Sequence, residues 1–243
     1  MTATIDEVTQ RLHDRSEALP QHLAHRRIFI DTYRRTTLAV GRAVDEAGFE
    51  DPEWVSNWDV EFAELYLNAH DADQDGRRVP RPWRLAFDAP AELPALRHVL
   101  LGINAHVNYD LPQSLLAVIS DADFDDEVLM SRRRRDHERI DGVLAGRVAA
   151  EDAELGAAKT LLDRILTPLN RRASARFLRE SRQKVWHNTT ELQRARRVGA
   201  DAYRDRLAEL EVLAAARIAD LLAPGQVLLR LAVAGFGVVL PPL

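Results

Sequence analysis

The stretch LLGINAHVNYDLP, residues 100–112, combines a long apolar segment with two ionisable side chains. His106 and Asp110 lie four residues apart, and residues at this spacing share one face of a helix. Burying an imidazole and a carboxyl group is costly unless the two are paired or bind a ligand. The stretch therefore predicts a central buried helix that carries the best candidate site in the chain.

Apolar residues recur at three- and four-residue spacing along most of the sequence, which is the period of an α-helix. The central motif falls within a helix predicted from about 92 to 120, with a kink at Pro112. The tripeptide Asp-Pro-Glu at 51–53 supplies an N-cap, a first-turn proline and an acid that open another helix. No convincing strand alternation, internal repeat or linker interrupts this pattern. The chain is predicted to form an all-α fold, a single-domain helical bundle of about seven to nine helices over residues 1–243.

Three segments differ from the helical background. The polar run 70–78 predicts a loop. The basic run 132–139 is expected to form a salt-bridged helix face. Residues 226–243 are the most apolar part of the chain, but glycines and a Pro-Pro pair interrupt them. Because this segment is too short and too interrupted to cross a bilayer, we expect it to pack on the helical domain.

The composition is that of a soluble globular protein, with 243 residues of which 46% are hydrophobic and 29% charged. The formal net charge of -5 provides no general attraction to nucleic acid or anionic lipid. The mixed charges of residues 1–19 do not resemble a secretory signal peptide. The sequence contains no cysteine, which excludes disulfides and cysteine nucleophiles. We expect a cytoplasmic protein that binds a small molecule, with no nucleic acid or membrane as partner, and that could form a homo-oligomer.

His106 and Asp110 are the candidate catalytic residues. They could hold a metal ion together, or Asp110 could orient His106 as a general base. Asn104 and Asn108, in the same motif, could bind a polar ligand. The alternative is a buried polar knot that ties this helix to a neighbour through hydrogen bonds. The sequence leaves both interpretations open.

A metal site would need further ligands from other helices. His187 and Asp59 are the candidates, so the predicted ligands of a divalent ion such as zinc, manganese or iron are His106, Asp110, His187 and Asp59. The remaining histidines are expected at the surface or in loops: His13, His22, His25, His70, His98 and His137.

Aromatic residues support a second, metal-free interpretation. Tyr66, Trp58 and Trp186 are candidate ligand-binding residues, since aromatic side chains often line apolar pockets. The chain would then be a small-molecule-binding protein or a cyclase of specialised metabolism. An interaction protein that uses the basic run or residues 226–243 is a third interpretation.

The motif Gly-x-Asn-Ala-His-(Ile/Val)-Asn-x-Asp-Leu, here at residues 102–111, resembles the signature of a bacterial family of unknown function, DUF5995. Segments 54–67 and 185–187 look similar to the same family, and the resemblance extends over about residues 25–225. It implies an all-helical fold and no established activity. The His-x-x-x-Asp step is also similar to one that the zinc-dependent phospholipase C and P1 nuclease family uses in a trinuclear zinc site.

That more distant similarity implies at most a one- or two-metal site here. The chain lacks the N-terminal Trp ligand of those enzymes, and no second His-x-x-x-Glu step in it matches the pattern of that family. Taken together, the residues and the resemblances predict an enzyme of unknown substrate with a polar site around His106 and Asp110. A metal-assisted hydrolase or lyase is the first expectation.

Overall fold

The computed structural model describes residues 3–155 and 171–223, and every regular element in these residues is helical. The predicted all-α bundle is therefore confirmed, whereas the apolar segment 226–243 lies outside the described residues. The elements are α1 (Ile5–Ala18), η1 (Gln21–Arg26), α2 (Arg27–Asp45), α3 (Pro52–Gln74), α4 (Arg81–Phe87), α5 (Ala95–Ala105), η2 (His106–Asp110), α6 (Leu111–Val118), η3 (Asp123–Asp125), α7 (Glu127–Leu155), α9 (Arg171–Val198) and α10 (Ala200–Leu222).

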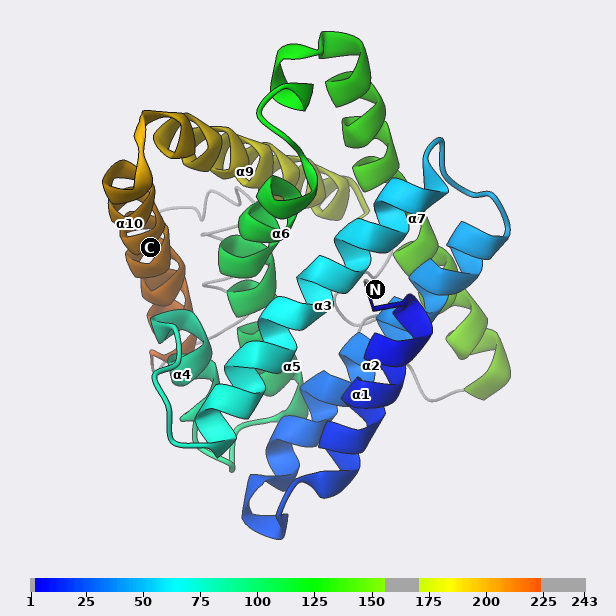
Figure 1. Cartoon of the computed structure of the whole chain (residues 1–243). Helices are drawn as coiled ribbons and strands as arrows, with labels where there is room; N and C mark the ends of the chain where they lie inside the picture. The colour runs from blue at the N-terminus through cyan, green and yellow to red at the C-terminus, as the bar shows by residue number, and fades with distance from the viewer. Residues whose placement is uncertain (1–2, 156–170, 224–243) are drawn as a thin grey trace, which may run out of the picture.

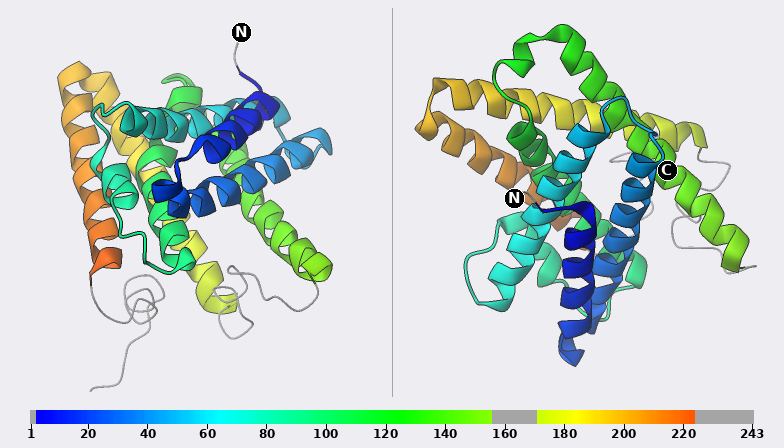
Figure 2. Two further views of the ribbon diagram at one scale, coloured as in Figure 1. Left: turned by 90° about the horizontal axis from the view of Figure 1, so that it is seen from below. Right: turned by 45° about the vertical axis from the view of Figure 1, so that its right-hand side comes forward.

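The α5–η2–α6 segment, which carries the central motif, is surrounded by other helices (Figure 1). Helix α3 crosses the molecule and packs against α6, while α2 packs against α5. Helices α9 and α10 run in opposite directions; α9 crosses the molecule towards α7, and α10 lies on the side away from α1 and α2 (Figures 1 and 2). Among the described residues, no helix has the length and apolar character needed to span a lipid bilayer.

Helix α3 begins as predicted but ends later. Its N-cap is Asp51, whose side chain accepts a hydrogen bond of 3.1 Å from the Trp54 N–H. The helix continues to Gln74, so the loop predicted for 70–78 is wrong for its first half. The reason is tertiary: His70 turns into the core, while the carboxylate of its neighbour Asp71 pairs with an arginine of α1.

The basic run 132–139 lies on α7 beside the loop that precedes α3. Four of its arginines pair with Glu50 and Asp51, which confirms the salt-bridged face. Asp136 is fully buried in the same contact and accepts hydrogen bonds of 2.7 and 2.9 Å from the backbone N–H groups of those two residues. This charge run therefore holds α7 to the start of α3.

Candidate functional site

The central motif forms a π-helical turn. The predicted continuous helix is divided into α5, the five-residue turn η2, and α6, and the Leu111 N–H donates to the carbonyl of His106, five residues back. The sequence predicted a kink at Pro112, and the irregular turn lies just before this proline, which follows it at the start of α6. Such π turns occur mostly as single inserts in α-helices, frequently at functional sites.

His106 and Asp110 form a hydrogen-bonded dyad inside this turn. The distance from His106 Nδ1 to Asp110 Oδ2 is 2.8 Å, and Trp83 Nε1–H donates to the same oxygen at 2.8 Å. The two residues are only 3% and 2% exposed. Burial lowers the pKa of His106, so its imidazole is neutral at neutral pH. Burial also raises the pKa of Asp110, which the hydrogen bonds from His106 and Trp83 oppose.

Five aromatic rings surround the imidazole of His106, and we call them the aromatic box. The closest ring stacks on His106 with a centroid distance of 3.5 Å and an interplanar angle of 6°, and the next meets it edge-on at 4.5 Å. The other three centroids lie 5.8 to 6.4 Å away. In order of distance the box contains Phe62, Tyr33, Trp83, Tyr66 and Phe29. Of the predicted ligand-binding aromatics, Tyr66 therefore lies at the dyad.

The buried polar atoms at this site that have no hydrogen-bond partner in the part of the chain that the structure describes include Nε2 of His106 and Oδ2 of Asp59. Since Nδ1 of His106 faces the Asp110 carboxyl group, Nε2 is the nitrogen with a free lone pair in the neutral ring. Asp59 lies one turn before Phe62 on α3, and burial raises its pKa to about 7. Asp59 and Asp110 both add to the burial effect that raises the pKa of Tyr33, so its hydroxyl stays protonated.

Gly102, Asn104 and Asn108 hold the turn together. A Cβ atom on Gly102 would lie 2.2 Å from a ring carbon of Phe29, so only glycine lets that ring reach the dyad. The Asn104 amide donates to the Leu100 carbonyl at 2.8 Å, and the Asn108 amide donates to the Asn104 carbonyl at 3.0 Å. The structure therefore shows both predicted ligand-binding asparagines bonded to their own helix.

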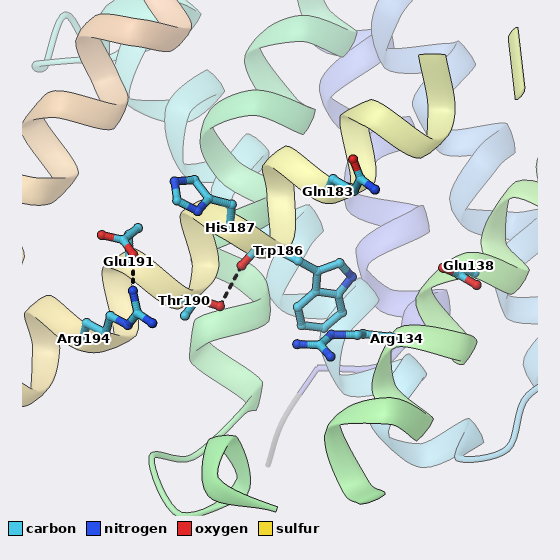
Figure 3. Close-up of a pocket in the computed structure, with 8 residues that line it drawn as sticks. All are labelled: Arg134, Glu138, Gln183, Trp186, His187, Thr190, Glu191 and Arg194. Carbon is cyan, nitrogen blue, oxygen red and sulfur yellow. Dashed lines mark hydrogen bonds and ion pairs between the residues drawn. The ribbon is translucent and has the colours of Figure 1, made fainter. Parts of the chain in front are cut away.

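His187 and Trp186 lie in a different place, a groove between α7 and α9 (Figure 3). The side chain of His187 is exposed, whereas Trp186 turns toward α7, where the Arg134 guanidinium lies 5.6 Å from its ring centroid. Trp58 is a core residue, and its Nε1–H donates to Ser114 Oγ at 3.1 Å. These predicted residues are thus not brought together with the dyad.

The predicted metal donors do not assemble into one group. Across residues 3–155 and 171–223, no three His, Asp, Glu or Cys side chains are placed to hold a metal ion together. His187 is on the exposed side of α9, and Asp59 lies beside the aromatic box. Within the described residues the donor set is therefore limited to the His106–Asp110 pair, which is already bonded to itself.

Several residues at the site were not predicted. Tyr33 gives no local signal, and the bond between Trp83 and Asp110 joins positions 27 residues apart. The sequence pattern does place Phe62 on one face of α3 with Asp59 and Tyr66, at three- and four-residue steps, but it does not show that Phe62 stacks on His106. The expected surface location is wrong for three histidines, which are buried and lie next to the rings of other side chains: His70, His98 and His137.

Comparison with known proteins adds a family and no activity. Neither a curated protein nor a solved structure matches this sequence. One family model, described as a family of unknown function (DUF5995), matches residues 5–224, which include the whole α5–η2–α6 segment. The match extends over most of the chain, and the protein therefore belongs to the DUF5995 family.

Proposed function

We propose that this protein is an enzyme in which His106 acts as a general base on a small organic substrate and Asp110 orients the imidazole. The observation that carries the proposal is the state of His106. Its ring is buried and neutral, Nδ1 is held by Asp110, and Nε2 has no partner among the described residues. A general base needs this combination of a fixed tautomer and a free lone pair.

The surroundings of the dyad suit proton abstraction from the substrate itself. When Nε2 accepts a proton, the Asp110 carboxylate 2.8 Å from Nδ1 stabilises the imidazolium that forms. The aromatic box excludes bulk water, and electrostatic interactions are stronger in such an environment. A protonated Tyr33 hydroxyl is available as a hydrogen-bond donor to developing negative charge. These features favour lyase-type chemistry over hydrolysis, because hydrolysis would require water in the site.

A metal-assisted mechanism lacks support from the donor set described above, so we derive no step through a metal ion. A bound zinc, manganese or iron ion stays a prediction, as does the distant similarity to the zinc-dependent phospholipase C and P1 nuclease family. The cytoplasmic location and a homo-oligomeric state also stay predictions.

A binding protein without catalysis is the second candidate, and the aromatic box favours it. Five rings around one imidazole could hold an apolar ligand, or shape a reactive chain in a cyclase, without any proton leaving the substrate. The two functions differ in what His106→Asn does. If the protein is an enzyme, His106→Asn abolishes turnover. If it is a binding protein, neither the wild type nor His106→Asn shows turnover.

The test combines spectroscopy with an unbiased search for substrates. Nitrogen NMR of the full chain at pH 7 should show His106 neutral, with the proton on Nδ1. Incubation with a metabolite extract, followed by mass spectrometry, should reveal a component that the wild-type protein consumes and His106→Asn and Asp110→Asn do not. His22→Asn, at an exposed histidine, is the matched control and should behave as wild type. A doubly protonated His106 at pH 7, or full turnover by His106→Asn, would rule out the general-base function.

A further inference from the structure

A small cavity lies next to the aromatic box, on the side of η1 and α4. Its volume is about 20 Å³, enough for a group the size of one or two water molecules. Three of its walls are rings that also contact His106, namely Phe29, Tyr66 and Trp83. The cavity is therefore separated from the dyad only by side chains of the aromatic box.

Nitrogen atoms without partners surround the outer end of this cavity. Arg26 and His98 line it, and Arg26 Nε and His98 Nε2 are buried with no hydrogen-bond partner in the described ranges 3–155 and 171–223. His98 is only 6% exposed. The ring of His25, whose Nε2 is likewise buried without a partner among those residues, lies 4.9 Å from that of His98.

The contacts of Arg26 leave one edge of its guanidinium available. One terminal nitrogen pairs with Asp73, and the planar group lies over the Phe87 ring at 5.0 Å. The Nε–H edge is free to donate to a second acceptor, and guanidinium groups bind carboxylates through two parallel hydrogen bonds. An anion at this edge would also favour the protonated form of the neighbouring His98. Burial lowers the pKa of His98, so a carboxylate at this cavity would be held by the Nε–H of Arg26 together with a His98 ring that takes up a proton on binding.

The cavity and the dyad lie along one face of the same segment. His98, Gly102 and His106 follow one another at four-residue steps, and His98 and Gly102 both line the cavity. Eight residues of helix correspond to about 12 Å along the axis. A molecule held at His98 could therefore present a group about 12 Å away to the imidazole of His106.

We propose that Arg26 and His98 bind the carboxylate of an organic acid whose apolar body lies along Phe29, Tyr66 and Trp83. The reactive end of this acid reaches His106, and that part of the inference rests on the proposed function. Medium-chain and arylalkanoic acids combine a carboxylate with an apolar body of the kind that these three rings would contact. Because the cavity holds only a water-sized group, aromatic side chains must rotate to admit the body, a rearrangement common at binding sites.

Calorimetric titration of the full chain tests the carboxylate site directly. The probes are octanoate and 4-phenylbutyrate, each paired with its uncharged amide, octanamide and 4-phenylbutanamide. The carboxylates should bind the wild-type protein at least 10-fold more tightly than the amides. Equal affinity for acids and amides, or no binding of either acid, would overturn the proposal.

Two variants and two controls assign the effect to these residues. Arg26→Lys keeps a charge opposite Asp73 but removes the Nε donor, and His98→Gln removes the imidazole. Each should weaken carboxylate binding at least 10-fold and leave amide binding unchanged, and circular dichroism confirms that each is folded. If one variant does not fold, the other decides. The exposed residues Arg78 and His22 give the controls Arg78→Lys and His22→Gln, which should bind as wild type. Unchanged affinity in the folded test variants contradicts the proposal.

His106→Asn separates this inference from the proposed function. It should keep its affinity for octanoate within about 3-fold, because the carboxylate is held about two helical turns away from His106, while losing any turnover. If carboxylate binding depends on Arg26 and His98 but no acid is turned over, the binding site is supported and the general-base function is contradicted. If turnover depends on His106 but acids are not preferred as substrates, the general-base function is supported and the carboxylate site is contradicted.

Discussion

Asp59→Asn should make the protein more stable, by an amount that depends on pH in a defined way. Asp59 is 8% exposed, its Oδ2 has no partner among the described residues, and burial raises its pKa from the ordinary 3.8 to about 7. One pKa unit corresponds to about 1.4 kcal/mol, so holding the ionised carboxylate in the folded state above pH 7 costs about 4 kcal/mol. Asparagine has nearly the same shape and no charge to bury.

The sign of the pH dependence follows from proton binding. Between about pH 4 and pH 7 the folded protein keeps a proton on Asp59 that the unfolded chain has lost, so this carboxyl group makes stability fall as the pH rises. The advantage of Asp59→Asn should be near zero at the acid end and grow by about 1.4 kcal/mol per pH unit. Above pH 7 it should level off at about 4 kcal/mol.

Urea unfolding of both proteins at a series of pH values measures this difference. Titration of all other groups, including the histidines with lowered pKa values, is common to both proteins and cancels. Glu61→Gln, at an exposed acid on the same helix, is the matched control for removing a carboxylate from α3. A difference that is constant from pH 4.5 to 8.5 would refute the reasoning. If added zinc stabilised the wild type and not Asp59→Asn, Asp59 would be a metal ligand instead.

Three further predictions follow from single contacts. Gly102→Ala should lower the free energy of unfolding by about 2 kcal/mol, because the added methyl group would overlap the Phe29 ring. Gly142→Ala is the matched comparison: this helical glycine is exposed and has open space around it, so alanine should raise the free energy of unfolding by up to about 1 kcal/mol. Urea unfolding of the two alanine variants checks both signs. Asp136→Ala should cost about 3 kcal/mol, since two backbone N–H groups before α3 lose their charged acceptor, and hydrogen exchange at those amides should accelerate. If the His106–Asp110 site is metal-free, treatment with EDTA should leave the thermal unfolding temperature unchanged, whereas a decrease reversed by zinc, manganese or iron would support the predicted metal ion instead.

The helices could be predicted from the sequence because the features that form them lie close together along the chain. The N-cap at Asp51 and the periodic apolar residues depend only on neighbours along the chain. The π turn could not be predicted in the same way. His106 and Asp110, four residues apart, meet on one face in a regular helix and in this turn alike, so the motif does not distinguish the two.

The partners of the dyad depend on tertiary contacts, which explains why most of them were missed. Trp83 reaches Asp110 from α4, and Phe62 reaches His106 from α3. The same reason applies to His98, which was expected at the surface or in a loop. It is buried because η1 brings His25 against its ring. Residue type and spacing identified the centre of the site, but the residues around it follow from how the helices pack.

The choice between a functional site and a buried polar knot can be argued from the two nitrogens of His106. A polar knot that serves only to join helices is expected to provide hydrogen-bond partners for all its buried polar atoms, because each unpaired buried atom lowers the free energy of unfolding. Here Nδ1 is paired within the same turn, so it joins no two helices, and Nε2 has no partner among the described residues. The hydrogen bond that connects the dyad to another helix comes from Trp83 and ends on Asp110, not on His106. The arrangement thus costs stability at the atom that a general base would use, which favours the site over the knot.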